Sequence, residues 1–181
     1  MPPCPAGDIG SLLKAVAFAA HAHRHQLRKD NKTPYASHVF RVCIILRHVF
    51  GIDDPHVMQA AVLHDTIEDT TTDFDDLREQ FGADVAGWVS LLSKDKRLPE
   101  EERERAYMAG LSVAPWQVKA CKLADVYDNC VDSEHLTPHQ RTKTTQRSRE
   151  YLAALDVALP PELRQAWSLI NDLLERTKSD H

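Results

Sequence analysis

The chain has 181 residues, of which 43% are hydrophobic and 27% are charged. This length suits one domain with a sizeable core, because domains average roughly 150 residues, and the composition excludes a disordered chain or a disulfide scaffold. The formal net charge of -5 and the pI of about 6.0 exclude a general attraction to nucleic acid or to an anionic membrane. We therefore expect a globular protein that binds neither.

Neither the cysteines nor the apolar runs of the chain indicate export or membrane insertion. The cysteines are scattered and form no CxxC pair: Cys4, Cys43, Cys121 and Cys130. This arrangement is typical of reduced thiols. The longest apolar run near the start, 15–20, is far shorter than the roughly 20 residues of a membrane span, and no basic segment precedes it. We expect a cytoplasmic protein.

Apolar residues recur at helical spacing along nearly the whole chain, and no segment alternates with a period of two. The apolar stripes lie at 13–20, 39–49, 57–61, 85–92, 118–124, 151–155 and 169–174. Prolines and capping residues separate them and start the next helix. The pattern predicts an all-α protein with about eight or nine helices, in which a loose N-terminus over 1–8 precedes one domain over 9–178.

Four polar residues stand where the helical pattern places buried side chains. His38 and His64 each continue a stripe of core positions, and Asp65 follows His64 directly. Asp125 comes four residues after the apolar Cys121, on the same helical face. Because a buried carboxylate is costly unless it is paired, a divalent metal shared by two imidazoles and two carboxylates would satisfy all of them. This ligand set suits Mn, Fe or Zn, and its oxygen share favours Mn.

The helical spacing alone leaves this metal site open. A single core histidine more often bonds a carbonyl, and a single helical aspartate is usually a cap. In addition, His64 and Asp65 are adjacent and cannot both point inward from a straight helix. A shared ion therefore requires the helix to end at this pair, or the site to lie at the edge of the helix.

The segment that begins at Asp65 carries six acids within residues 65–76. Those at 73–76 begin the next expected helix, where carboxylates favour the positive end of the helix dipole. Glu68 and Asp69 differ, because each lies four residues, about one helical turn, beyond His64 and Asp65. They are the candidate acid and base that act on a metal-bound water.

Basic residues form several clusters although the net charge is negative. Arg28 and Lys29 directly precede the TPYASH segment that contains His38, so they are candidates to place positive charge beside the metal for a phosphorylated substrate. The other clusters are typical of solvated helix faces and lie at 94–97, 119–122 and 141–149. The HAHRH run at 21–25 fits an exposed helix face better than a metal site of its own.

Four sequence blocks resemble the RelA/SpoT-type HD-domain hydrolases, and among them the small alarmone hydrolases, in order and spacing: FAAHAHRHQLRKDNKTPYASH (18–38), AAVLHDTIEDT (60–70), FGADV (81–85) and KLADVYDN (122–129). The resemblance runs from about residue 11 to residue 155. It implies a single HD-domain helical bundle, in agreement with the all-α pattern.

The resemblance also implies roles for individual residues. One Mn(II) ion, with Zn or Fe as alternatives, would be held by His38, His64, Asp65 and Asp125. Glu68 and Asp69 match the acid/base pair of the family. The substrate would contact basic, polar and aromatic residues from three parts of the chain: Arg28, Lys29, Lys122, Asn129, Arg147 and Tyr151.

Members of this family hydrolyse the 3′-diphosphate of (p)ppGpp, which yields GDP or GTP and pyrophosphate. The resemblance therefore implies a hydrolase for a small nucleotide, with attack at the phosphorus bound to the 3′ oxygen. Only a helix or two follow residue 155, so we expect degradation without synthesis. The sequence predicts no particular oligomeric state.

Other functions would keep the same site. The alternative substrates are (p)ppApp, and NADPH losing its 2′-phosphate. A third alternative is a catalytically inactive nucleotide-binding sensor, which the intact Glu68 and Asp69 disfavour. Two departures from the family stand near these residues. Val39 replaces a proline that is common after the ligand histidine, and LPEEERERA (98–106) is acidic where some relatives are basic.

Overall fold

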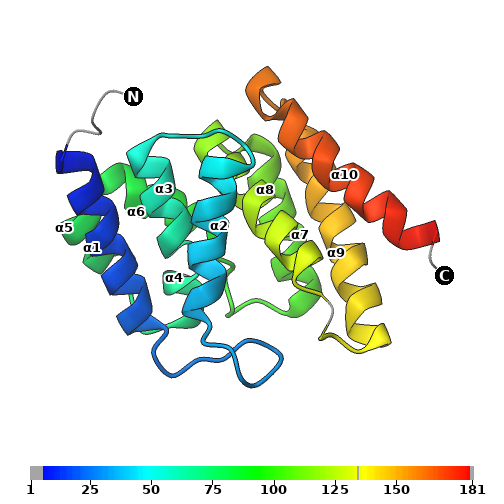
Figure 1. The fold of residues 1–181 in the computed structure, drawn as a ribbon, viewed down its shortest axis with the longest axis horizontal. Coiled ribbons are helices and arrows are strands. Elements are labelled where there is room, and N and C mark those ends of the chain that lie inside the picture. The colour runs from blue at the N-terminus through cyan, green and yellow to red at the C-terminus, as the bar shows by residue number, and fades with distance from the viewer. Residues whose placement is uncertain (1–5, 134, 180–181) are drawn as a thin grey trace.

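The computed structural model describes residues 6–133 and 135–179 (Figure 1). Within these residues the regular secondary structure is helical, apart from one isolated β-bridge between Leu27 and Pro34. The elements are α1 (Ala6–Ala22), α2 (Ala36–His48), α3 (Pro55–Leu63), α4 (Thr66–Asp69), α5 (Phe74–Phe81), α6 (Ala83–Leu92), α7 (Glu100–Val113), α8 (Trp116–Val131), α9 (Pro138–Asp156), the 3-10 helix η1 (Pro161–Leu163) and α10 (Arg164–Ser179). The all-α bundle expected from the sequence is confirmed.

The predicted boundary at residue 9 falls near the start of the described chain. Residues 1–5 of the segment expected to be loose lie outside the described residues. Helix α1 begins at Ala6. The division into a terminus and one domain stays a prediction.

Capping residues in the sequence set several helix starts. Asp54 precedes α3 and accepts hydrogen bonds from two backbone N–H groups of its first turn. Asp73 and Asp76 form a capping box before α5, and Thr137 and Gln140 form another before α9. The acids at 73–76 therefore start a helix, as the sequence predicted.

Helices α3 and α8 form the centre of the bundle, and they deliver the polar residues of interest. Helix α3 packs against α1, α2, α6 and α8. The stretches 59–63 of α3 and 118–126 of α8 are buried at every position, as expected for helices that are covered on all sides. In Figure 1, α1 and α5 lie at one end of the bundle, and α9 and α10 at the other. His64 directly follows α3, and Asp125 lies on α8.

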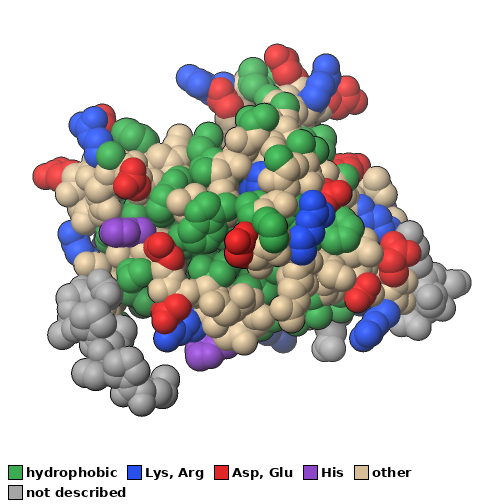
Figure 2. All heavy atoms as spheres, turned by 90° about the horizontal axis from the view of Figure 1, so that it is seen from above, with side chains coloured by type: hydrophobic (Ala, Val, Ile, Leu, Met, Phe, Trp, Pro, Cys, Tyr) green, Lys and Arg blue, Asp and Glu red, His purple; other side chains and the backbone are tan. Residues whose placement is uncertain are grey.

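One end of the bundle carries a group of apolar side chains. Figure 2 looks onto the end where α7 finishes and α8 begins, and apolar side chains gather near the centre of this face. Exposed apolar residues at these helix ends include Val113 and Trp116. Asp125 lies nine residues after Trp116, which is about 13 Å along a helix. The apolar face is therefore separate from the polar cluster described below.

The described cysteines are free, and the described helices include no candidate membrane span. Cys43, Cys121 and Cys130 are free thiols, and Cys4 lies outside the described residues. Among the helices that the structure describes, none has both the length and the apolarity needed to cross a bilayer. The cytoplasmic location stays a prediction.

A buried lysine ties two helix ends together. Lys119 of α8 is 2% exposed, and its Nζ donates a hydrogen bond to Ser112 O at the end of α7 (3.0 Å). The same Nζ donates to the backbone oxygens of Leu155 (3.5 Å) and Val157 at the end of α9. Burial lowers the pKa of this amine. The last carbonyls of a helix lack partners within the helix, so this side chain satisfies them from outside.

We predict that Lys119→Met lowers the free energy of unfolding by about 1–3 kcal/mol. Methionine keeps the apolar stem but leaves several buried carbonyl oxygens without a donor. Urea denaturation measures the change. Lys14→Met is the matched control, because Lys14 donates to one exposed carbonyl, that of Gln80. Equal stability of the two variants would contradict this role for Lys119.

Candidate metal centre

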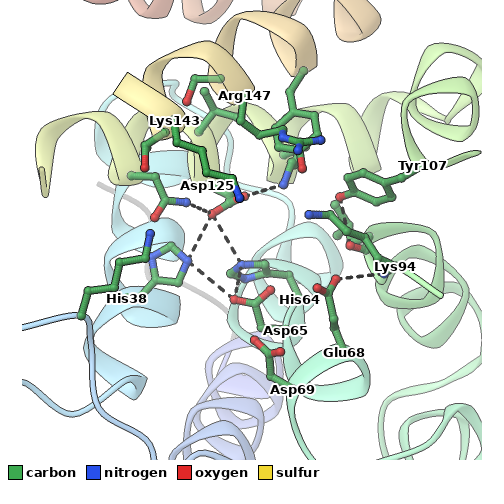
Figure 3. Close-up of a pocket in the computed structure, with 18 of the residues that line it drawn as sticks. His38, His64, Asp65, Glu68, Asp69, Lys94, Tyr107, Asp125, Lys143 and Arg147 are labelled. Carbon is green, nitrogen blue, oxygen red and sulfur yellow. Dashed lines mark hydrogen bonds and ion pairs between the residues drawn. The ribbon is translucent and has the colours of Figure 1, made fainter. Parts of the chain in front are cut away.

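The four candidate ligands come from different elements and converge at one point (Figure 3). His38 lies on α2, and Asp125 lies on α8. Helix α3 ends at Leu63, and the next helix, α4, begins only at Thr66. His64 and Asp65 occupy this break, with Asp65 at φ −99° and ψ −1°. The interruption lets two adjacent side chains face the same point, which a straight helix forbids.

The ligand atoms form a closed ring of alternating nitrogens and oxygens. His38 Nε2 lies 3.2 Å from Asp125 Oδ1 and 3.7 Å from Asp65 Oδ2. His64 Nε2 lies 3.0 Å from the same Asp65 oxygen and 3.9 Å from the same Asp125 oxygen. Ligands about 2.0–2.2 Å from one metal ion lie about 3–4 Å from each other. The four neighbouring N–O separations are therefore of the size expected around a single ion, and the ligand atoms of His38, His64 and Asp65 also lie within 4.8 Å of one another.

The histidine tautomers also fit a metal. His64 Nδ1 lies 2.8 Å from Ala61 O, which can only accept, so Nδ1 carries the proton in the neutral ring. His64 Nε2 then presents a lone pair, and it is a buried atom without a hydrogen-bond partner. A buried lone pair that faces carboxylate oxygens is unfavourable unless a cation lies between them. The cluster of His38, His64 and Asp65 can thus hold a divalent ion, and Asp125 closes it.

Electrostatics in the metal-free protein support the same conclusion. Burial acts to lower the pKa of His38, but hydrogen bonds with Asp125 and Asp128 raise it to about 9. Burial acts to raise the pKa of Asp125, but Lys122 and the two histidines hold it well below the ordinary value. The surroundings therefore favour negative carboxylates and positive charge at the centre of the ring.

A cavity of about 440 Å³ opens above the ring. Its lining includes both acid/base candidates and all six substrate-binding candidates: Arg28, Lys29, Glu68, Asp69, Lys122, Asn129, Arg147 and Tyr151. The volume lies within the range of small-molecule sites, about 300–1,000 Å³. The structure therefore brings the predicted residues to one place, while their individual roles stay predictions.

The acid/base candidates lie on α4, one turn past the helix break. Glu68 accepts a hydrogen bond from the backbone N–H of Lys94 (2.9 Å), and burial raises its pKa above the ordinary value. Asp69 pairs with the Lys96 ammonium at 2.6 Å. In Figure 3 Asp69 lies beyond Asp65 on the side away from Asp125, and Glu68 lies to the side, toward Lys94. Their environments differ, because Asp69 is neutralised by a cation and Glu68 is desolvated.

The cations of the cavity fall into two groups. Arg28, Lys122 and Arg147 are held by carboxylates at 2.7–2.8 Å. Lys29 has no carboxylate within ion-pair distance among the residues that the structure describes. Burial lowers its pKa first, and the charges of Arg28 and Lys143 lower it further. Lys29 is exposed, and a lysine without a carboxylate partner beside two other cations is a place where an anion is stabilised.

The sequence analysis did not identify Glu104 as part of this site. Glu104 of α7 is buried and accepts hydrogen bonds from Lys94 (3.1 Å) and from the Tyr151 hydroxyl (2.8 Å). It also pairs with Arg147 at 2.8 Å. It belongs to the acidic segment 98–106, whose charge departs from some relatives. Its burial could have been predicted from helical spacing, because Glu104 lies three and seven residues before Tyr107 and Leu111 on the same buried face of α7.

The HAHRH run divides in the structure. His23 is buried, its Nδ1 lies 2.7 Å from Gln26 Oε1, and its ring packs against Tyr35. The Tyr35 hydroxyl in turn donates to Asp65 Oδ2 at 2.6 Å. His21 and His25 are exposed, so the run does not converge on a metal site of its own.

Comparison with known proteins identifies the family. The pattern described as an HD domain matches residues 15–155. The chain belongs to the HD-domain family. This HD-domain chain is similar to proteins named guanosine-3′,5′-bis(diphosphate) 3′-pyrophosphohydrolase MESH1. It is 43% identical to the one from Xenopus tropicalis over 145 residues and 40% identical to the one from Drosophila melanogaster over 139 residues. These matches cover 80% and 76% of both chains, respectively.

A solved structure agrees with these matches. It is described as "A metazoan ortholog of SpoT hydrolyzes ppGpp and plays a role in starvation responses", and its TM-score with this HD-domain chain is 0.80 at 31% identity. The match covers 94% of this chain and 96% of the other. The resemblance to RelA/SpoT-type HD-domain hydrolases is confirmed.

We predict that Mn(II) stabilises the protein through these ligands. Free Mn(II) at 100 times its Kd should add about 2.7 kcal/mol to the free energy of unfolding. Asp125→Asn should abolish this stabilisation. Asp95→Asn should keep it, because Asp95 is an exposed partner of Arg97. Thermal unfolding with and without Mn(II) measures the effect, and an equal shift in both variants would show that the metal binds elsewhere.

Proposed function

We propose that this chain hydrolyses the 3′-diphosphate of (p)ppGpp, which releases pyrophosphate and leaves GDP or GTP. The observation that supports this most is a ring of four metal-ligand atoms at the base of a cation-lined cavity. A polyphosphate needs such cations, and cleavage at phosphorus needs a centre of positive charge beside an activated water. The names of the similar proteins support the choice of (p)ppGpp within this reaction class.

The proposed cofactor is one Mn(II) ion, with Zn or Fe as alternatives, held by His38, His64, Asp65 and Asp125. Two imidazole nitrogens and two carboxylate oxygens form a borderline to hard donor set, which suits these metals. When bound, the ion supplies positive charge at the attacked phosphorus and makes a nearby water more acidic.

The proposed acid/base groups are Glu68 and Asp69. Water attacks the phosphorus bound to the 3′ oxygen, an O–P bond forms, and the P–O3′ bond breaks. Glu68 takes the proton that the attacking water loses, since a carboxylate with a raised pKa is a better base than an ordinary one. The pair passes a proton to the departing 3′ oxygen, which leaves as a hydroxyl group.

The proposed substrate contacts are Arg28, Lys29, Lys122, Asn129, Arg147 and Tyr151. Lys29 has the most freedom to bind phosphate, because the other cations of this set already have carboxylate partners. Arg28 presents its guanidinium from the loop before α2, where it is held by Asp132. The proposed partner is thus a small nucleotide and not a nucleic acid.

A substrate panel tests the proposal. Purified protein with Mn(II) is given ppGpp, ppApp and NADPH, and kcat/KM is compared through release of pyrophosphate or phosphate. We expect ppGpp to have the highest kcat/KM. A higher value for NADPH or ppApp would move the assignment to that substrate. No turnover of any of them would favour the nucleotide-binding sensor.

We predict that Glu68→Gln lowers kcat by about 10²–10⁴-fold and leaves KM within a few-fold. Glutamine keeps the size of the side chain but cannot take a proton. Burial raises the pKa of Glu68 above the ordinary glutamate value of 4.5, so the deprotonated form that acts as the base is lost at a higher pH than for an ordinary glutamate. As the pH is lowered, kcat/KM of the wild-type enzyme should therefore begin to fall while the pH is still above 4.5. Glu79→Gln, on the exposed face of α5, is the control. A Glu68→Gln enzyme with more than a tenth of wild-type kcat would remove Glu68 from the mechanism.

A further inference from the structure

Asp128 is a fully buried carboxylate behind the metal ligands. It lies on α8, three residues after Asp125, and its exposed fraction is 0%. Its Oδ2 atom lies 2.7 Å from Nδ1 of His38. His38 therefore lies between two aspartates of α8, with Nδ1 toward Asp128 and Nε2 toward Asp125.

Two arginines and a second aspartate complete the surroundings of Asp128. Arg41 Nε lies 2.7 Å from Asp128 Oδ1, and Arg28 Nη2 lies 3.8 Å from Asp128 Oδ2. Asp132 bridges the same two arginines, at 3.1 Å from Arg41 and 2.7 Å from Arg28. Arg28 also lines the cavity above the metal ring. This charged network thus reaches from a metal ligand to a cation of the substrate cavity.

The two ligand histidines are held differently. The acceptor for Nδ1–H of His64 is a neutral backbone carbonyl, that of Ala61. The acceptor for Nδ1–H of His38 is a carboxylate. A carboxylate behind an imidazole fixes the ring and its tautomer, and it makes the opposite nitrogen a stronger donor to a metal. Burying a carboxylate between arginines is in itself poor evidence for added stability, so a role at the metal is the better explanation.

We propose that Asp128 is a positioning residue that fixes His38 with its Nε2 lone pair toward the metal, while Asp132 anchors Arg28 for the substrate. This inference deepens the proposed function and rests on its metal site. It assigns different tasks to two aspartates of one network. Asp128 acts on metal affinity through His38, and Asp132, which does not contact His38, acts on substrate binding through Arg28.

The test separates these tasks with matched substitutions. The Kd for Mn(II) is measured on metal-free protein without substrate, by the electron paramagnetic resonance signal of free Mn(II). Asp128→Asn should raise the Kd by about 10–100-fold, the usual effect of removing such a partner. Asp132→Asn should leave the Kd within threefold and raise KM for ppGpp. An Asp128→Asn Kd within threefold of wild type, or an equal loss in Asp132→Asn, would overturn the proposal.

A second measurement uses the protein with Asp128 intact, so it remains possible if the Asp128→Asn variant does not fold. In the wild-type protein loaded with Zn(II), a long-range ¹H–¹⁵N spectrum reports the tautomer of each histidine. The His38 signals are those that disappear in His38→Gln. We expect His38 to carry its proton on Nδ1, and a proton on Nε2 would overturn the proposal. Because the Kd for Mn(II) and the histidine tautomer are both measured without hydrolysis, normal metal binding without turnover of ppGpp would contradict only the proposed function.

Discussion

The structure depends on one constraint, the placement of the buried Asp125 and the partly buried Asp65 beside two imidazoles. A carboxylate in the interior of a helical bundle is strongly unfavourable unless positive charge meets it. In this chain the oxygens of these two residues alternate with the Nε2 atoms of His38 and His64 at separations of 3.0–3.9 Å. Lys122 and Asn129 then donate to Asp125, and Tyr35 donates to Asp65. The centre of the ring is where we propose that a divalent cation binds.

The fold meets this constraint by interrupting a central helix. If α3 continued through α4, His64 and Asp65 would diverge by about 100° around its axis. The break between Leu63 and Thr66 turns both toward α8, where Asp125 lies in the stretch 118–126 that is buried at every position. The same break carries α4, so Glu68 and Asp69 follow the metal ligands closely. Two of the four candidate ligands, His64 and Asp65, and both acid/base candidates therefore come from one local feature of the backbone, while His38 and Asp125 come from α2 and α8.

Much of this arrangement could be predicted from the sequence. Helical periodicity and capping residues gave the all-α bundle, and the spacing of His38, His64 and Asp125 placed them on buried faces. Spacing could not join these faces, because the break after α3 is fixed by tertiary packing, and the family resemblance was needed to select the metal site. Glu104 and Asp128 were missed for a related reason. Each looks like an ordinary helical acid, and its burial depends on arginines and lysines that are distant in the sequence.

The central claim is that four side chains hold one ion. The most direct measurement is the anomalous scattering of a crystal of the protein grown with Mn(II). The account predicts one strong peak within coordination distance of Nε2 of His38 and His64 and of carboxylate oxygens of Asp65 and Asp125. An anomalous peak from bound Mn(II) outside this ring would contradict the account. So would four side chains that point apart, with no ion between them.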